Sequence, residues 1–244
     1  MPPRGKLLAV EGIDGAGKHT QVELLARALE RRGIAHLPLS FPHYQSFFGQ
    51  AVGQYLSGDF GRLDQVDPHF SALLYAGDRL EAKGELESAL AAGRLVLADR
   101  YVGSNLAHQG ARVGPAHRAE FLSWVRRLEY EIFGLPRENM VIYLRIPAEE
   151  AIERMASRAK KLSRDIQEGD RQHLEDAAAV YDSLAKSEAW AVVESFDPGA
   201  KRPRPPGEIH REILALCRSR LGVDGGTAAS AEPPDETARE TGGH

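Results

Sequence analysis

The chain has a single cysteine, Cys217, which excludes a disulfide framework and is typical of a protein kept in a reducing compartment. Because this cysteine lies in the amphipathic segment "REILALCRSRL", we interpret it as a packing residue and not as a nucleophile. Long apolar runs are lacking as well: none reaches the roughly 20 residues that a membrane-spanning helix needs, and the N-terminus lacks a secretory pattern. We therefore expect a cytoplasmic protein with no membrane partner.

The main part of the chain also lacks an excess of either charge. Residues 222–244 hold five acidic residues and one arginine, so the total of 31 basic and 35 acidic residues leaves 30 of each in residues 1–221. A neutral body argues against a nucleic-acid partner, because general nucleic-acid binders carry a basic excess. We expect one domain over residues 1–221 and a disordered acidic tail over 222–244, which has almost no large apolar residues.

Short apolar segments alternate with amphipathic segments along the whole body. Strands separated by helices pair in parallel, so we predict an α/β fold of three layers, a five-stranded parallel sheet flanked by helices on both faces. Ligands of such sheets bind at the carboxyl ends of the strands. The predicted strands are residues 6–12, 35–42, 94–99, 139–146 and 190–195, and the predicted helices are 18–32, 66–93, 115–134, 147–161, 167–187 and 206–221.

The segment "GIDGAGK", from Gly12 to Lys18, follows the first predicted strand and opens the first predicted helix. Its spacing, G-x-x-x-x-G-K, is that of a phosphate-binding loop. The glycines let backbone N–H groups turn toward a phosphate, while the helix N-terminus and the lysine add positive charge. The alternative, a glycine-rich turn between core elements, does not explain why the lysine and the helix follow at this spacing.

His19 stands where this pattern normally has a serine or threonine that contacts Mg²⁺. Imidazole is a poor ligand for magnesium, which prefers oxygen atoms. Either Thr20, or nearby carboxylates and waters, hold the metal, or the site is inactive. The side chain of His19 can also point toward solvent or toward a phosphate.

A second polar stretch, "DRYVGSNLAHQGAR", occupies residues 99–112 directly after the third predicted strand. Asp99 is placed to orient Mg²⁺, in part through water, and Arg100 offers two parallel donors for a second phosphate. Ser104 and Asn105 supply neutral hydrogen-bonding groups of the kind that a base edge needs. The alternative is a capped loop with a surface ion pair.

A third polar stretch, "RMASRAKKLSRD", concentrates positive charge over residues 154–165. Arg154 and Arg158 are spaced i, i+4 and share a helix face, where they repel each other mildly without an anion between them. Glu150 can pair with Arg154, so an ordinary solvated face stays open as an alternative. A mobile basic lid, about residues 154–168, would instead close over a transferring phosphoryl group and exclude water.

Taken together, these residues resemble the thymidylate kinases over about residues 5–217. The motifs that carry the resemblance are "EGIDGAGKHTQ", "FPHY", "LLYAGDR", "DRYVGSNLAHQGAR" and the basic lid followed by "DIQEGDRQHLEDAAAVYDSL". The resemblance implies a P-loop kinase fold and an enzyme that passes the γ-phosphoryl group of ATP to dTMP with Mg²⁺, making dTDP for dTTP synthesis. It also implies a homodimer formed through helices. The alternatives are a kinase for another pyrimidine monophosphate, such as dUMP or UMP, and a catalytically dead nucleotide-binding regulator.

Carried over by position, the resemblance implies which residues bind each nucleotide. Asp14 lies between the two nucleotides, near the acceptor 3′-OH and the metal, for which Asp99 is the second candidate. The catalytic set is Lys18, Arg100, Asp14, Arg154 and Arg158. ATP is bound by Gly12, Gly15, Ala16, Gly17, Lys18, His19, Thr20, Arg154 and Arg158.

For dTMP, the resemblance implies that Tyr44 and Arg100 hold the phosphate and that Tyr75 stacks on thymine. Arg79 reaches a thymine carbonyl and Asn105 reads the base edge, with Ser104 as nearby support. Packing in the core is the alternative for Tyr75. The remaining implied dTMP contacts are Asp14, His108, Asp165 and Gln167.

Two residues depart from the family pattern. His108 replaces a tyrosine that crowds the sugar 2′ position, so the preference for deoxyribose can be relaxed here. His19 is similar to a basic residue found at this position in a bacterial subset, in which the loop aspartate helps to carry Mg²⁺. By that analogy Asp14 takes over the metal role, and we expect an active enzyme with shifted metal ligands.

Overall fold

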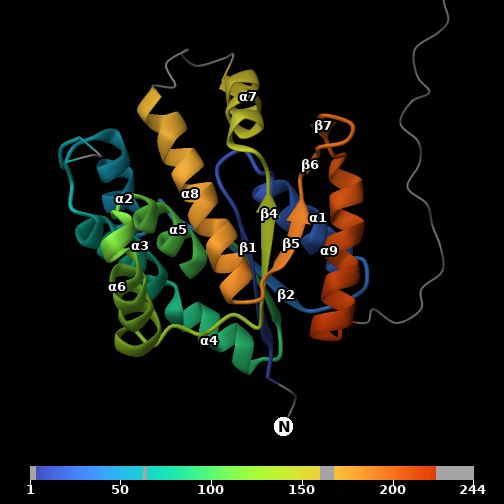
Figure 1. Ribbon diagram of the computed structural model, residues 1–244. Coiled ribbons are helices and arrows are strands. Elements are labelled where there is room, and N and C mark those ends of the chain that lie inside the picture. The colour runs from blue at the N-terminus through green and yellow to red at the C-terminus, as the bar shows by residue number, and fades with distance from the viewer. Residues whose placement is uncertain (1–3, 63–64, 160–167, 224–244) are drawn as a thin grey trace, which may run out of the picture.

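The computed structural model describes residues 4–62, 65–159 and 168–223. Its centre is a sheet of five parallel strands in the order β2-β3-β1-β4-β5 (Figure 1). The predicted five-stranded parallel sheet flanked by helices is therefore confirmed. The strands are β1 (Lys6–Glu11), β2 (His36–Ser40), β3 (Leu95–Asp99), β4 (Met140–Arg145) and β5 (Ala191–Glu194).

Helices cover both faces of this sheet. Helix α1 packs with α9 on one face, while α5 and α8 pack together on the other (Figure 1). In the described residues the helices are α1 (Lys18–Glu30), α2 (Phe47–Ser57), α3 (Pro68–Glu81), α4 (Lys83–Ala91), α5 (Val102–Ala111), α6 (Pro115–Arg126), the π-helix η1 (Arg127–Ile132), α7 (Ala148–Ala159), α8 (Glu168–Ser187) and α9 (Pro206–Leu221). A small antiparallel pair, β6 (Phe196–Asp197) and β7 (Arg202–Pro203), precedes α9.

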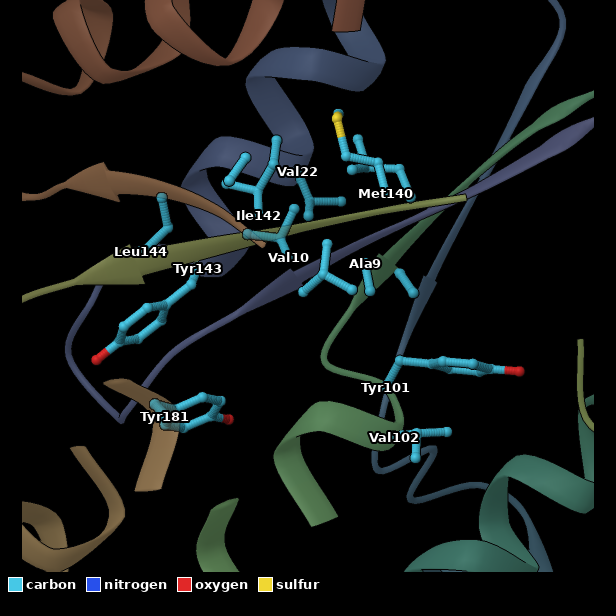
Figure 2. Close-up of a cluster of buried hydrophobic side chains, with 14 of the residues drawn as sticks. Ala9, Val10, Val22, Tyr101, Val102, Met140, Ile142, Tyr143, Leu144 and Tyr181 are labelled. Carbon is cyan, nitrogen blue, oxygen red and sulfur yellow. The ribbon is translucent and has the colours of Figure 1, made fainter. Parts of the chain in front are cut away.

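The central strands are buried on both faces because helices lie above and below them. All five residues of β3 are buried, as the apolar run predicts for a parallel strand covered on both sides. Figure 2 shows the alternation: Val10 and Ile142 point toward Val22 of α1, whereas Tyr143 points toward Tyr181 of α8. The rings of Tyr143 and Tyr181 are stacked, with centroids 5.2 Å apart.

One local prediction differs from the structure, and two helices lie where no element was predicted. The single helix expected over residues 66–93 is two helices, α3 and α4. They meet at Ala82, whose ψ of −6° interrupts the helical hydrogen bonding. Gly84, a weak helix former, lies two residues further along. Helix α2 had no counterpart among the predicted elements. Most of the polar stretch 99–112 is helical, since α5 begins at Val102.

The predicted tail, residues 222–244, lies outside the described residues except for its first two positions. The predicted lid, residues 154–168, lies largely outside them as well, and its first residues belong to α7. Among the helices of the described segments, none combines the length and the apolar character needed to cross a membrane.

Candidate active site

The loop between β1 and α1 is shaped by glycines whose backbone conformations are rarely adopted by residues with a side chain. Gly12, Gly15 and Gly17 have φ values of 144°, 81° and 99°, a region that side chains disfavour. A Cβ atom on Gly12 would lie 2.6 Å from the Leu144 carbonyl oxygen, and one on Gly15 would lie 2.6 Å from that of Ala151. The loop therefore packs closely against the end of β4 and against the first turn of α7.

Lys18 is buried at the start of α1, and its ammonium group donates to the Ile13 carbonyl at 2.8 Å. Burial lowers the pKa of Lys18 to about 7, helped by the positive charge of Arg100 and opposed by the negative charges of Asp14, Asp99 and Glu11. A lysine held in this way is ready to gain stabilisation from an anionic ligand. Ala16, in the same loop, is buried as well.

Arg100 follows β3 directly and has a φ of 67°, an uncommon conformation for a residue with a side chain. Its guanidinium group forms an ion pair with Asp14 and donates to the hydroxyl of Ser104 at 3.2 Å and to Nε2 of His108 at 3.3 Å. It also approaches the Gly12 carbonyl at 3.4 Å. The strand end thus joins the phosphate loop to the polar face of α5.

These contacts change the acid–base properties of the two neighbours of Arg100. The positive charge of Arg100 holds the pKa of Asp14 well below its usual range, although burial opposes this shift. Burial lowers the pKa of His108 to about 3, and Arg100 lowers it further. At neutral pH Asp14 is therefore an anion and His108 is a neutral ring that accepts a hydrogen bond.

The charges of this group act on two tyrosines from different parts of the chain. Burial raises the pKa values of both Tyr44 and Tyr75, and the charges of Arg100 and Asp14 act on both hydroxyls. The ring of Tyr44 is about half exposed. That of Tyr75 packs edge-on against Tyr55, with centroids 6.3 Å apart. Tyr75 therefore has a packing role, and the charges of the site act on its hydroxyl.

Asp78 supports the segment that carries Tyr44. Its buried carboxylate accepts the backbone N–H of His43 at 3.1 Å and the hydroxyl of Ser46 at 3.1 Å. Ser46 in turn caps α2, because its hydroxyl oxygen accepts the N–H of Gly49 at 2.9 Å. The missed helix α2 and the position of Tyr44 are thus linked through one carboxylate.

Arg79 and Asn105 are both almost fully buried and share one partner, Glu129. The guanidinium group of Arg79 makes two hydrogen bonds to the Glu129 carboxylate, at 2.6 and 2.7 Å. The amide nitrogen of Asn105 donates to the same carboxylate at 2.7 Å and to the Ala72 carbonyl at 3.0 Å. Glu129 had not been singled out in the sequence, where it reads as one of several charges in a helix.

Ser104 is held in a second buried carboxylate network, centred on Glu11. The fully buried carboxylate of Glu11 accepts the Ser104 hydroxyl at 2.6 Å, the Tyr181 hydroxyl at 3.1 Å and the Tyr101 N–H at 2.8 Å. The hydroxyl of Ser104 thus donates to Glu11 and accepts from Arg100. Glu11 and Tyr181 were not predicted as site residues, although a carboxylate at the end of β1, directly before the loop, is a usable signal.

The outer side of the phosphate loop is bounded by α7 and by Ser195, which follows β5. Arg154 donates from its guanidinium group to the Gly15 carbonyl at 3.3 Å and to the Ser195 carbonyl at 2.8 Å. The Ser195 hydroxyl donates to the Ala16 carbonyl at 3.0 Å. Arg158 lies in α7, but its side chain is not among those described, and Asp165 and Gln167 lie outside the described residues.

His19 is exposed and lies between two carboxylates. Its Nδ1 atom is 3.4 Å from the Asp99 carboxylate, and its Nε2 atom is 3.3 Å from that of Glu23. Thr20 is half-buried one residue further along α1. Within residues 4–62, 65–159 and 168–223, no three His, Cys, Asp or Glu side chains gather as an all-protein metal site.

Comparison with known proteins agrees with this geometry. A family model described as thymidylate kinase matches residues 10–201. A thymidylate kinase of Mycobacterium tuberculosis is 35% identical over 201 residues, which cover 79% of this chain and 94% of that protein. A probable thymidylate kinase of Pyrobaculum calidifontis is 31% identical over 215 residues, covering 88% and 96%. The solved structure of thymidylate kinase from Candida albicans has the same fold, with a TM-score of 0.67 and 17% identity over 89% of this chain and 93% of that chain.

Proposed function

Because the chain belongs to the thymidylate kinase family, we propose that the site described above is where it transfers the γ-phosphoryl group of ATP to dTMP. The protein is an ATP-dependent nucleoside monophosphate kinase, and its products are dTDP and ADP. One observation supports the location most directly: the side-chain amine of Lys18 contacts the Ile13 carbonyl, and the guanidinium group of Arg100 contacts Asp14 and the Gly12 carbonyl of the same loop. Two phosphate chains brought together there meet a positive charge on each side.

On the donor side, the backbone amides of the glycine loop surround the ATP phosphates. Lys18 supplies charge, and the N-terminus of α1 adds its dipole. Arg154 contacts the loop backbone through Gly15, so a short movement of its guanidinium group would reach a phosphate. The remaining donor-side residues in this proposal are Gly12, Ala16, Gly17, His19, Thr20 and, from α7, Arg158.

On the acceptor side, Arg100 and Tyr44 bind the dTMP phosphate, and Tyr75 stacks on thymine. Arg79 and Asn105 read the base. The carbonyl oxygen of Asn105 supports this role, because it is buried and has no hydrogen-bond partner among the described residues. His108 lies next to Arg100, beside the sugar. We extend the acceptor site to Asp165 and Gln167 on the family pattern alone.

The reaction needs positioning and charge neutralisation more than covalent chemistry. The acceptor is a phosphate oxygen that is already anionic near neutral pH, so no side chain acts as a strong base. Lys18, Arg100 and the arginines of α7 neutralise the charge that the transferring group spreads over its oxygens. Asp14, between the two cations, keeps Arg100 oriented toward the acceptor before the nucleotides bind.

The residues present fit magnesium as the metal that accompanies ATP. Magnesium is held by one or two carboxylates together with substrate phosphates, and the charges of Asp14 and Asp99 both act on Lys18 beside the loop. His19 contacts Asp99 and supplies no oxygen ligand, so the metal role falls to the aspartates. When bound, magnesium would offset part of the phosphate charge.

We propose that two copies of the chain associate through α3. This helix exposes Phe70, Leu73 and Leu80, and the ring of Phe60 packs edge-on against that of Phe70. Exposed apolar side chains gathered on one helix are typical of a protein–protein interface. Sedimentation velocity is expected to give a dimer, and Leu73→Glu is expected to give a monomer. A cytoplasmic location without nucleic-acid or membrane partners stays a prediction.

A coupled assay of ADP release tests the proposed activity. With ATP and magnesium, dTMP is expected to be the best acceptor in a panel that also holds dUMP, UMP, dCMP and dGMP. A clear preference for dUMP or UMP would make the protein a kinase for another pyrimidine monophosphate. Binding of ATP without ADP release in the presence of dTMP would make it a regulator.

A further inference from the structure

The amide of Asn105 has a single orientation in the structure, because both of its hydrogen-bond partners are acceptors. On one side lie the Glu129 carboxylate, 2.7 Å away, and the Ala72 carbonyl, 3.0 Å away. Only the NH₂ group can bond to both, so the carbonyl oxygen must point elsewhere. That oxygen is buried and unpartnered among the described residues, although buried polar atoms normally have a partner.

Asn105 is joined to elements that carry other acceptor-side residues of the proposed site. Asn105 follows Ser104 on α5 and lies three residues before His108, both of which contact Arg100. Its amide nitrogen binds Ala72 on α3, three residues before Tyr75. Asn105 therefore links the two helices that carry Tyr75 and His108.

Glu129 fixes the second base-reading residue in the same way. Its carboxylate accepts Nε and Nη2 of Arg79, which leaves Nη1 as the one guanidinium nitrogen of Arg79 without a hydrogen-bond partner among the described residues. Glu129 is fully buried and lies on the π-helix η1, a rare form that is frequent at functional sites. One carboxylate thus orients both residues from behind.

We propose that Glu129 is a positioning residue that makes the site select thymine and uracil over cytosine. The inference rests on the proposed function, because it assigns the base to Asn105 and Arg79. Held by Glu129, Asn105 presents an acceptor and Arg79 presents a donor. Thymine and uracil match this pair, since their N3 carries a hydrogen and their C4 carries an oxygen. Cytosine has an acceptor at N3 and an amino group at C4, so both contacts are mismatched.

Glu129→Gln tests this inference, because glutamine offers both an acceptor and a donor and so lets the amide of Asn105 turn over. The measured quantity is the ratio of kcat/KM for dTMP to that for dCMP. We expect the variant to lower this ratio at least ~10-fold, since an unmatched buried polar group is a strong source of discrimination. The matched control is Glu138→Gln. The carboxyl group of Glu138 accepts a hydrogen bond from the Tyr130 hydroxyl at 2.7 Å, and the change is expected to leave the ratio unchanged.

Glu129→Asp provides a second variant in which Arg79 keeps a buried countercharge. Its shorter side chain withdraws the acceptor from Asn105, so the ratio is again expected to fall. The preference for binding dTMP over dCMP, measured by calorimetry, is expected to fall with it. This measurement tests the inference for a variant that binds nucleotides without turnover. If both variants weaken dTMP and dCMP by the same factor, Glu129 has only a structural role and the inference is wrong. A wild-type protein that does not phosphorylate dTMP would instead overturn the proposed function.

Discussion

Arg100→Ala removes the guanidinium group that joins the phosphate loop to α5. In the structure this group contacts the Asp14 carboxylate, the Ser104 hydroxyl and the His108 ring, and it is mostly shielded from solvent. A cation placed against a reacting phosphate in a shielded site is worth more than the same contact in water. We expect kcat/KM for dTMP to fall at least ~100-fold, which corresponds to about 2.7 kcal/mol of transition-state stabilisation.

The same position allows a graded test. Arg100→Lys keeps the charge but lacks the planar fork that binds two phosphate oxygens at once, so we expect an intermediate loss of about 10-fold. Arg126→Ala is the matched control, because Arg126 lies on α6 in an ion pair with Glu188 that is partly open to solvent. Pairs of this kind contribute little, and its kcat/KM is expected to stay close to that of the wild type.

The assay is steady-state ADP release, with dTMP varied at saturating ATP and then ATP varied at saturating dTMP. Circular dichroism and thermal unfolding of each variant show whether the fold is kept. The reasoning predicts that the loss appears in the dTMP parameters. Near-normal turnover in folded Arg100→Ala, or a loss confined to the KM for ATP, would refute the assigned role.

Three further predictions concern the loop and the sugar. Because the pKa of Lys18 is about 7 in the folded chain and near 10.5 in the unfolded chain, the unfolded state binds more protons between these values, and stability due to this group rises with pH there. At pH 8 the amine of Lys18 is mostly neutral, and the ATP phosphates favour its charged form. Calorimetry at pH 8 in two buffers should therefore show proton uptake on ATP binding, which Lys18→Met should abolish. Gly15→Ala, whose Cβ would meet the Ala151 carbonyl, should weaken ATP binding at least ~10-fold, whereas Gly84→Ala, in open space on α4, should not; equal affinities would contradict the close packing. His108→Tyr should raise the kcat/KM ratio of dUMP to UMP at least ~10-fold, and an unchanged ratio would remove His108 from the sugar site.

The sheet and the phosphate loop follow from local sequence. The glycines and Lys18 occupy a fixed spacing between an apolar strand and an amphipathic helix, so both elements and the loop are readable without tertiary information. The parallel direction of the strands follows from the alternation of strand and helix. These features are predictable because the local pattern of apolar residues and glycines that the sequence shows also determines them in the folded chain.

Helix α2 was missed because its own sequence is ambiguous. Its segment "FFGQAVGQYLS" includes two glycines, which weaken a helix, and its large apolar residues lie on several faces, with Phe47 and Leu56 exposed. The cap from Ser46 and the link to Asp78 stabilise it in the folded chain. Asp78 is 32 residues away, so no local pattern reveals the contact.

The residues that orient the site could also not be predicted from the sequence. Glu11 and Glu129 read as ordinary charged residues, yet each is fully buried and accepts hydrogen bonds from residues far along the chain. Burial of a carboxylate is decided by tertiary packing, and its partners lie 170 and 50 residues away. Motifs therefore indicate candidate substrate contacts more readily than the residues that hold those candidates in place.

The most direct test of the account is a crystal structure of the protein with dTMP and a non-hydrolysable ATP analogue bound together. We expect the backbone amides of Gly12–Lys18 to surround the donor phosphates and the guanidinium group of Arg100 to lie within hydrogen-bonding distance of the acceptor phosphate. A complex in which the loop is turned away from the donor, or in which Arg100 stays on Asp14 far from the acceptor, would contradict it.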